Sequence, residues 1–236
     1  MNKIKYALQS VGAPHGDKTV DKLYKFMDLV LERNEVINLT TITDRDEFEV
    51  KHMMDSFMCY GWSEIEKAHA IVDVGTGAGF PGVPLALLYP EKKFLLVDSL
   101  NKRLEFIKDA TEELNIKNVQ VLHERAEDMG QNKDFREQYD LCLSRALANL
   151  STLSEYCYPL IKKGGYIYAY KTKGTVNEIE SSETARKLLG GSEDVEIRTR
   201  EIPGFHLDHV ILILEKERRT PDTYPRKAGV PSKVPL

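Results

Sequence analysis

The chain has 236 residues and a formal net charge of −4, with 42% hydrophobic and 30% charged residues. This length is enough for one well-packed main domain with an appendage. The apolar runs are too short to cross a bilayer, and the N-terminus lacks the apolar core of a secretory signal. The three cysteines show no pairing pattern, as is usual in a reducing compartment, so we expect a cytoplasmic protein without a membrane partner. The acidic balance argues against a dedicated nucleic-acid binder.

Charge is unevenly distributed along the chain. Residues 218–236 contain five basic residues and one acidic residue, a net of +4, so residues 1–217 carry −8 (−4 minus +4). A basic segment of this kind either meets a polyanionic partner or simply solubilises the chain. Its four prolines exclude a regular helix or strand. We expect this basic, proline-rich tail to be either disordered or docked across the main domain.

Residues 1–67 show a helical pattern and predict an N-terminal helical extension packed on the core. Apolar residues recur at three- and four-residue steps over residues 20–31, and a second helix is predicted over about residues 44–58. On this second helix His52 and Asp55 lie three positions apart and so share a face. We interpret them as a packing pair that orients the layer, with a substrate role as the alternative.

From residue 70 onward the pattern changes to alternating strands and helices, which predicts an α/β fold with a mostly parallel sheet and helices on both faces. We assign residues 68–217 to this main domain. The predicted strands cover residues 70–74, 94–98, 119–122, 139–144, 166–170, 195–200 and 209–215, and the predicted helical segments cover residues 83–89, 101–114, 131–138, 150–160 and 176–189.

A glycine-rich turn follows the first predicted strand. Gly75, Gly77 and Gly79 let the backbone take positive φ and approach a ligand closely. Phe80 stands where the dinucleotide-binding fingerprint has its third glycine. The preceding carboxylate, Asp73, suits a ligand with an ammonium group better than a pyrophosphate. The turn therefore favours S-adenosylmethionine over a nicotinamide cofactor, which is kept as the rival.

The ends of the next three strands carry polar residues suited to the same ligand. Asp98 ends the second strand, 19 residues after Gly79, at the separation of an acid that accepts the hydroxyls of a ribose. After the third strand comes Arg125-Ala126-Glu127-Asp128, where a backbone amide and a carboxylate can meet an adenine edge. Arg145 follows the fourth strand. Because parallel strands end at one edge of the sheet, these positions predict a single crevice.

Six motifs distributed along the chain occur together: Asn38–Thr40, His52 with Asp55 and Ser56, Val72–Gly82, Asp98–Arg103, Ser144–Ala146 and Tyr224–Pro231. On these motifs the sequence resembles the RsmG family, also called GidB, over nearly its whole length. That resemblance implies a bacterial enzyme with a Rossmann-like S-adenosylmethionine-dependent methyltransferase fold, which methylates N7 of one guanine in 16S ribosomal RNA and releases S-adenosylhomocysteine.

The resemblance also implies roles for single residues. Gly75 and Phe80 match the family's cofactor contacts in the glycine turn, and Asp98 matches its ribose acid. Ala126 and Glu127 match the adenine contacts, and Arg145 matches an arginine at the mouth of the site. The predicted cofactor-binding residues are therefore Asp73, Gly75, Gly77, Gly79, Phe80, Asp98, Ser99, Ala126, Glu127 and Arg145.

Guanine N7 has a lone pair and no proton to lose, so its methylation requires no general base. We expect catalysis by positioning, with Arg145 as the catalytic residue. Its guanidinium can hydrogen-bond guanine O6, a phosphate or the cofactor carboxylate. The structural alternative is an ion pair at the end of the fourth strand, with Asp98 or Glu127.

The expected partner is 16S ribosomal RNA or a small-subunit assembly intermediate, bound by a monomer without a metal site. We predict RNA contacts at Lys173, Arg226 and Lys227. Deleting residues 220–236 should then weaken RNA binding much more than cofactor binding. Two other classes remain open: a methyltransferase acting on a small molecule or a protein, and a non-catalytic RNA-binding module.

Overall fold

The computed structural model describes residues 2–175 and 177–236 and contains a seven-stranded sheet in the order β3-β2-β1-β4-β5-β7-β6. Strands β1 to β5 are parallel, while β7 lies antiparallel between β5 and β6. The strand order reverses between β1 and β4, which is where sheets of this kind bind ligands. The strands are β1 Ala70–Val74, β2 Lys93–Asp98, β3 Val119–His123, β4 Tyr139–Arg145, β5 Ile161–Thr172, β6 Glu196–Arg198 and β7 His209–Glu215.

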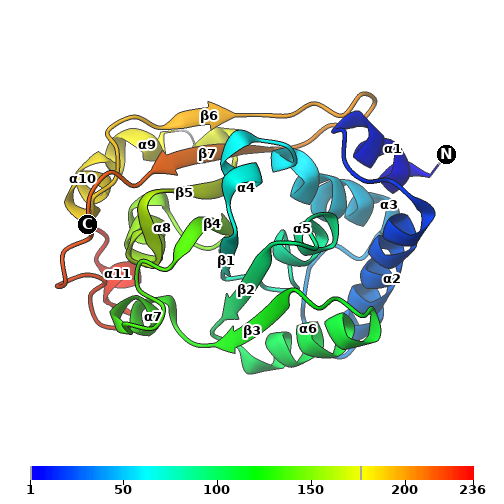
Figure 1. The fold of residues 1–236 in the computed structure, drawn as a ribbon, viewed down its shortest axis with the longest axis horizontal. Coiled ribbons are helices and arrows are strands. Elements are labelled where there is room, and N and C mark those ends of the chain that lie inside the picture. The colour runs from blue at the N-terminus through cyan, green and yellow to red at the C-terminus, as the bar shows by residue number, and fades with distance from the viewer. Residues whose placement is uncertain (1, 176) are drawn as a thin grey trace.

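Helices cover both faces of the sheet, as the alternation of strands and helices predicts (Figure 1). Side chains alternate between the faces along each strand, so Ile71 and Val72 of β1 enter different cores. The first core includes the N-terminal helices α1 Lys3–Ser10, α2 Asp17–Asn34, α3 Arg45–Phe48 and α4 Ser63–Lys67, together with α5 Gly82–Leu88 and α6 Asn101–Glu113. The second includes α7 Ala126–Gln131, α8 Leu150–Cys157 and α10 Glu183–Leu189.

The second predicted helix is irregular in the structure. It begins at the Asp44 cap, whose side chain accepts a hydrogen bond from the Glu47 amide. After α3 it widens to the π-helix η1, Glu49–Met54, and ends with the 3₁₀ turn η2, Phe57–Cys59. π-helical segments are rare in proteins, and those that occur are often found at functional sites.

Several predicted boundaries are wrong. The helix expected over residues 131–138 lies earlier as α7, because two acidic residues in its first turn favour that N-terminus. The predicted stop at residues 162–165 is instead part of β5, where Gly165 packs too closely on the Asp140 carbonyl for any side chain. The last predicted helix is broken into α9 Glu178–Ser181 and α10, and its predicted start, Val176, lies outside the described residues.

The tail is ordered and crosses the side of the domain that carries α7, α8 and α10 (Figure 1). The expectation that it holds no helix or strand is wrong in one place, because Val230–Lys233 form the short helix α11, with Pro231 in its first turn. The remaining short 3₁₀ elements are η3 Tyr158–Leu160 and η4 Lys173–Thr175. Across the described ranges, no helix is both long and apolar enough to traverse a bilayer.

Candidate active site

Two pockets meet at the carboxyl edge of the sheet, one on each side of Gly75 and Ala146. The first, called here the histidine pocket, measures about 320 Å³ and lies between η1, the glycine turn and the loop before β7. The second, the tail pocket, measures about 350 Å³ and lies between the ends of β2 and β3, the loop after β4 and the tail. Both are also lined by Arg103, which the sequence analysis did not single out.

The glycine turn shapes the junction of the pockets. Gly75 has φ +72°, a conformation that favours glycine, and a Cβ there would lie 2.5 Å from Leu147 Cδ1 and would displace the end of that side chain. Gly77 has φ +61° and faces open space in the histidine pocket. Gly79 lines neither pocket, because a Cβ there would point into the core at 2.8 Å from Val83 Cγ2.

Asp73 fixes the conformation of the glycine turn. Its carboxyl is fully buried, and Oδ2 accepts hydrogen bonds from Thr76 Oγ1 (2.8 Å) and the Gly82 amide (3.0 Å). Burial raises the pKa of Asp73 to about 6. The side chain lines neither pocket, so its visible role is to fix the turn, and its contact with a cofactor stays a prediction.

The tail pocket brings together the predicted ribose and adenine residues Asp98, Ser99, Ala126 and Glu127. Two backbone amides hold the Asp98 carboxylate: Oδ2 accepts from the Gly77 amide (3.0 Å) and Oδ1 accepts from the Leu100 amide (2.9 Å). Arg103 Nη1 lies 3.4 Å from Asp98 Oδ2. The acid is therefore pre-organised at the strand end, as a ribose-binding carboxylate has to be.

The tail forms one wall of this pocket. Gly229 donates its amide to Glu127 Oε1 (2.8 Å), and Ser232 lines the pocket beside Tyr156. The Thr152 hydroxyl donates to the Pro231 carbonyl (3.0 Å) and so fixes α11 against α8. Neither Tyr156 nor Ser232 was predicted, because nothing in their local sequence indicates where the tail docks.

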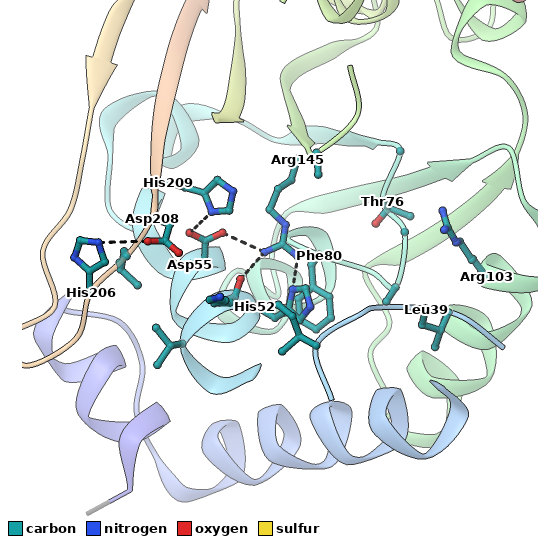
Figure 2. A pocket seen from close by; sticks show the side chains of 18 residues that line it. Leu39, His52, Asp55, Thr76, Phe80, Arg103, Arg145, His206, Asp208 and His209 are labelled. Atoms are coloured by element: carbon teal, nitrogen blue, oxygen red, sulfur yellow. Dashed lines mark hydrogen bonds and ion pairs between the residues drawn. The ribbon is translucent and has the colours of Figure 1, made fainter. Parts of the chain in front are cut away.

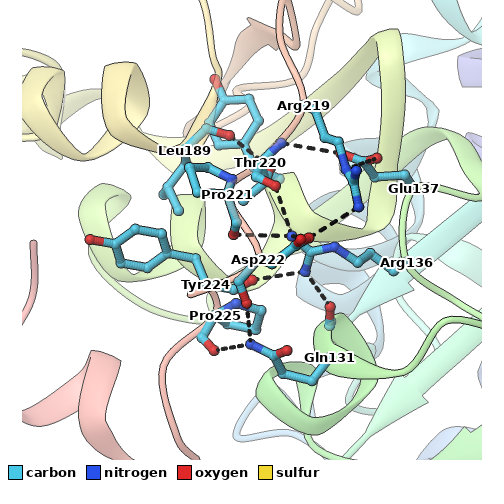
Figure 3. Close-up of polar contacts among 12 residues, drawn as sticks. Gln131, Arg136, Glu137, Leu189, Arg219, Thr220, Pro221, Asp222, Tyr224 and Pro225 are labelled. Atoms are coloured by element: carbon cyan, nitrogen blue, oxygen red, sulfur yellow. Dashed lines mark hydrogen bonds and ion pairs between the residues drawn. The ribbon is translucent and has the colours of Figure 1, made fainter.

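Buried polar contacts anchor the tail. Arg226 makes a bidentate pair with the fully buried Glu155, with Nη2–Oε2 at 2.6 Å and Nε–Oε1 at 2.9 Å. Figure 3 shows Arg136 donating to the tail carbonyls of Thr220, Pro221 and Tyr224. The Arg226 guanidinium is paired with Glu155 while 25% of the side chain is exposed, so its visible role is to anchor the tail, and its RNA contact stays a prediction. Lys173 and Lys227 are exposed, and their RNA contacts stay predictions.

The loop after β4 separates the two pockets and is fixed from β5. Ala146 has φ +53°, an uncommon conformation for a residue with a side chain. Lys171 is buried and donates to the Ala148 carbonyl (2.6 Å) and to Glu178 Oε2 (2.7 Å). The same Glu178 oxygen accepts from the Leu150 amide at the start of α8 (2.7 Å). These contacts hold the loop in its strained form.

Arg145 is the centre of a buried network in the histidine pocket. Figure 2 shows its guanidinium between Asp55 and His52. Nη1 donates to Asp55 Oδ2 (3.2 Å) and to the Lys51 carbonyl (3.2 Å), and Nη2 donates to His52 Nδ1 (2.8 Å). The other Asp55 oxygen accepts from His209 Nδ1 (3.0 Å). The ion-pair alternative was thus right in kind but wrong in partner, because Asp55 replaces Asp98 and Glu127.

His52 is neutral in this network. Because an arginine can only donate, His52 Nδ1 accepts, and Nε2 carries the proton towards Thr40 Oγ1 at 2.8 Å. Burial and the adjacent guanidinium lower the pKa of His52 to about 3. The interpretation of His52 and Asp55 as a mere packing pair is therefore incomplete, since both line the pocket and hold Arg145.

Phe80 forms the floor of the histidine pocket. Its ring is almost fully buried, stacks on the His52 ring at 4.9 Å and lies 5.4 Å below the Arg145 guanidinium. It does not line the tail pocket. The side chain therefore supports the Arg145 network, and its cofactor contact stays a prediction.

Comparison with known proteins agrees with this geometry. The model of the family described as rRNA small subunit methyltransferase G matches residues 19–201. Two similar curated relatives, each named Ribosomal RNA small subunit methyltransferase G, come from Alkaliphilus metalliredigens (43% identical, covering 99% of this chain and 97% of the relative) and Clostridium tetani (43%, 98% and 96%).

Among solved structures, the S-adenosylmethionine-dependent methyltransferase SibL is similar in fold. Its apo form matches with a TM-score of 0.56 at 12% identity, over 90% of this chain and 73% of SibL. At that identity the match supports the Rossmann-like fold alone, whereas the match to the family model covers most of the chain. The chain belongs to the rRNA small subunit methyltransferase G family.

Proposed function

We propose that the protein transfers a methyl group from S-adenosylmethionine to N7 of a guanine in 16S ribosomal RNA. The observation that carries this proposal is the junction at Gly75, where the pocket with the pre-organised Asp98 adjoins a second pocket containing Arg145. We further propose that the enzyme acts as a monomer in the cytoplasm, on the RNA or on an assembling small subunit.

The residues present fit the cofactor. Asp98 would accept the ribose hydroxyls, and Ala126 with Glu127 would meet the adenine, all in the tail pocket. Gly75 and Ala146 line both pockets, so a cofactor bound in this way lies next to the histidine pocket. S-adenosylmethionine supplies an electrophilic methyl group on a positively charged sulfur. The protein's own task is therefore to bind and align the two reactants and to exclude water.

The charge balance of the Arg145 network supports an acceptor that becomes cationic. A guanine methylated at N7 carries a positive charge, so an uncompensated cation beside it would oppose the reaction. Asp55 neutralises Arg145 at 3.2 Å, and His52 is neutral near pH 7. The network therefore offers hydrogen-bond donors without adding net positive charge.

Arg145 has donors left for the substrate. Of its five N–H groups, three are committed to Lys51, Asp55 and His52. Arginine often recognises guanine through O6 and N7 together. Here N7 has to remain available as the nucleophile, so we assign one of the remaining Arg145 donors to O6. His52 has both ring nitrogens engaged, which fits a reaction that requires no general base.

The test is to methylate unmodified small-subunit RNA, free and in assembled particles, with the full-length protein. A guanine methylated at N7 becomes sensitive to strand cleavage by borohydride and aniline. The expected result is one new cleavage site that depends on both protein and S-adenosylmethionine. Methylation at another atom, or no transfer to either form of the RNA, would refute the proposal.

A further inference from the structure

We propose that Asp55 and His209 are positioning residues that hold Arg145 for methyl transfer, so that the start of β7 belongs to the active site. This inference rests on the proposed function only in taking Arg145 as the residue that meets the substrate. His209 lies beyond residue 201, where the match to the family model ends, and nothing in its local sequence suggested a role.

The sheet topology brings His209 to the active edge. Strands β1, β4 and β5 are parallel, so their last residues lie at one edge of the sheet. β7 runs antiparallel to β5, with His209 opposite Thr172, the last residue of β5. The first residue of β7 therefore lies beside the last residues of its neighbours. Arg145 is that last residue in β4, where it pairs with Tyr170.

Contacts connect these strand ends to the N-terminal layer. His209 Nδ1 donates to Asp55 Oδ1 (3.0 Å), and Asp55 Oδ2 accepts from Arg145 Nη1 (3.2 Å), with only 1% of the Asp55 side chain exposed (Figure 2). A buried carboxylate needs its oxygens satisfied. His209 fixes the rotation of this carboxylate and hence the direction of the ion pair with Arg145.

Positioning of this kind affects the reaction rate more than binding. Among the described residues Arg145 makes one ion pair, with Asp55; its other hydrogen bonds go to a neutral ring and a carbonyl. If the Asp55 carboxylate turns, the guanidinium shifts while the tail pocket is unchanged. A misplacement of about 1 Å can cost on the order of a hundredfold in rate.

The experiment compares His209→Ala, His209→Asn and Asp55→Asn in the full-length protein. Asparagine at position 209 keeps a short side chain with an N–H donor. Single-turnover methyl transfer to small-subunit RNA at saturating S-adenosylmethionine should fall about tenfold to a hundredfold in His209→Ala and Asp55→Asn, and His209→Asn should recover most of the loss. Cofactor affinity should change less than twofold. His15→Ala is the matched control, because His15 Nδ1 donates a local hydrogen bond to the Ala13 carbonyl (2.8 Å) and His15 lines neither site pocket.

A spectroscopic readout is independent of activity. Arginine side-chain NMR of the free wild-type protein should show separate Nη signals for a constrained Arg145, assigned by their loss in Arg145→Lys. His209→Ala should collapse these signals and His209→Asn should retain them. Wild-type turnover and unchanged signals in His209→Ala would overturn the proposal, as would equal losses in the alanine and asparagine variants. If the wild-type protein methylates another RNA atom, the guanine assignment fails while these comparisons still decide the role of His209.

Discussion

Arg226→Ala tests whether the basic tail is a structural wall or an RNA-binding arm. In the structure, the Arg226 side chain makes a bidentate pair with Glu155, and its backbone amide donates to the same carboxylate at 2.8 Å. Glu155 is fully buried, while the Arg226 side chain is 25% exposed. Removing the guanidinium therefore leaves a buried carboxylate with only its amide donor.

The expected loss of stability follows from this burial. Breaking a buried ion pair by removing one partner costs about 3–5 kcal/mol. Partial exposure of Arg226 lets water reach Glu155 after truncation, so we expect the lower end, about 3 kcal/mol, in the free energy of unfolding. For a chain of this size that loss lowers Tm by roughly 6–12 °C. Denaturant unfolding measures the free energy, and a thermal scan measures Tm.

Cofactor binding should weaken in the same variant. Gly229, which holds Glu127, and Ser232, which lines the tail pocket, follow Arg226 closely in the chain, so a loosened tail exposes the pocket. Titration calorimetry with S-adenosylmethionine measures this change. The expectation reverses the earlier one that loss of the tail would affect RNA binding more than cofactor binding.

Lys227→Ala is the matched control, because Lys227 is exposed and adjacent in sequence. Its free energy of unfolding should stay within about 0.5 kcal/mol of wild type, and only its RNA affinity should fall. Suppose instead that Arg226→Ala keeps wild-type stability and cofactor affinity while losing about one unit of salt dependence in RNA binding. Arg226 would then be a phosphate contact, and the structural argument would be refuted.

Three further predictions concern the buried groups of the site. Between pH 7 and pH 5 His52 takes up a proton in the unfolded chain, near its ordinary pKa of 6.5, but not in the folded site, where its pKa is about 3. His52 should therefore cost about 2 kcal/mol of stability at pH 5. A difference in unfolding free energy between wild type and His52→Asn that does not change with pH contradicts this. The effect of Asp73 on stability has the opposite sign, because its pKa in the folded protein, about 6, exceeds its ordinary 3.8, so folding takes up a proton. From pH 7 to pH 5 the wild type should gain about 1 kcal/mol in unfolding free energy relative to Asp73→Asn in the same assay. Gly75→Ala should weaken S-adenosylmethionine binding about tenfold by calorimetry, because φ +72° disfavours a residue with a side chain and the new Cβ displaces Leu147, which lines the tail pocket. Leu147→Ala in the same chain should recover only the part due to that displacement, and wild-type affinity in Gly75→Ala would contradict the prediction.

The sequence could predict that Asp98, Ala126 and Glu127 lie in one pocket because the signals for their positions are local. Strand β1 and the glycine turn adjoin in sequence, and Asp98 follows at a separation set by one helix and one strand. Ala126 and Glu127 follow β3 directly and line the same pocket as Asp98. The alternation of strands and helices and the residues of the turns were therefore enough to group these positions, since a parallel sheet places all these strand ends at one edge.

The Arg145 network could not be predicted in the same way because it depends on strand direction. His209 was correctly placed at the start of a strand, but hydrophobic pattern does not tell whether that strand runs parallel or antiparallel. Only the antiparallel direction of β7 brings His209 to the edge occupied by Arg145. Likewise, the spacing of His52 and Asp55 indicates a shared face but not the buried guanidinium that they contact.

Charge counting could not predict how the tail is held, because it ignores pairing within the chain. The tail's excess of basic residues suggested a partner outside the chain, yet Arg226 meets the buried Glu155, and Arg219 lies 3.5 Å from Glu137. The acidic body and the basic tail thus neutralise each other in part within one molecule. Their complementarity explains why a proline-rich segment with one short helix docks at all: ion pairs and donated hydrogen bonds replace the ladder contacts that its prolines cannot make.

Both pockets therefore depend on chain beyond residue 201, where the family-model match ends, but they depend on it differently. β7 lies inside the sheet between β5 and β6, so removing it removes the fold as well as His209. The tail lies on the surface of α7 and α8, held by side-chain contacts such as Arg226–Glu155. Its loss should leave the sheet and the Arg145 network in place while opening the tail pocket. The two C-terminal contributions to the site are thus separable, one through point variants at position 209 and the other through the anchors of the tail.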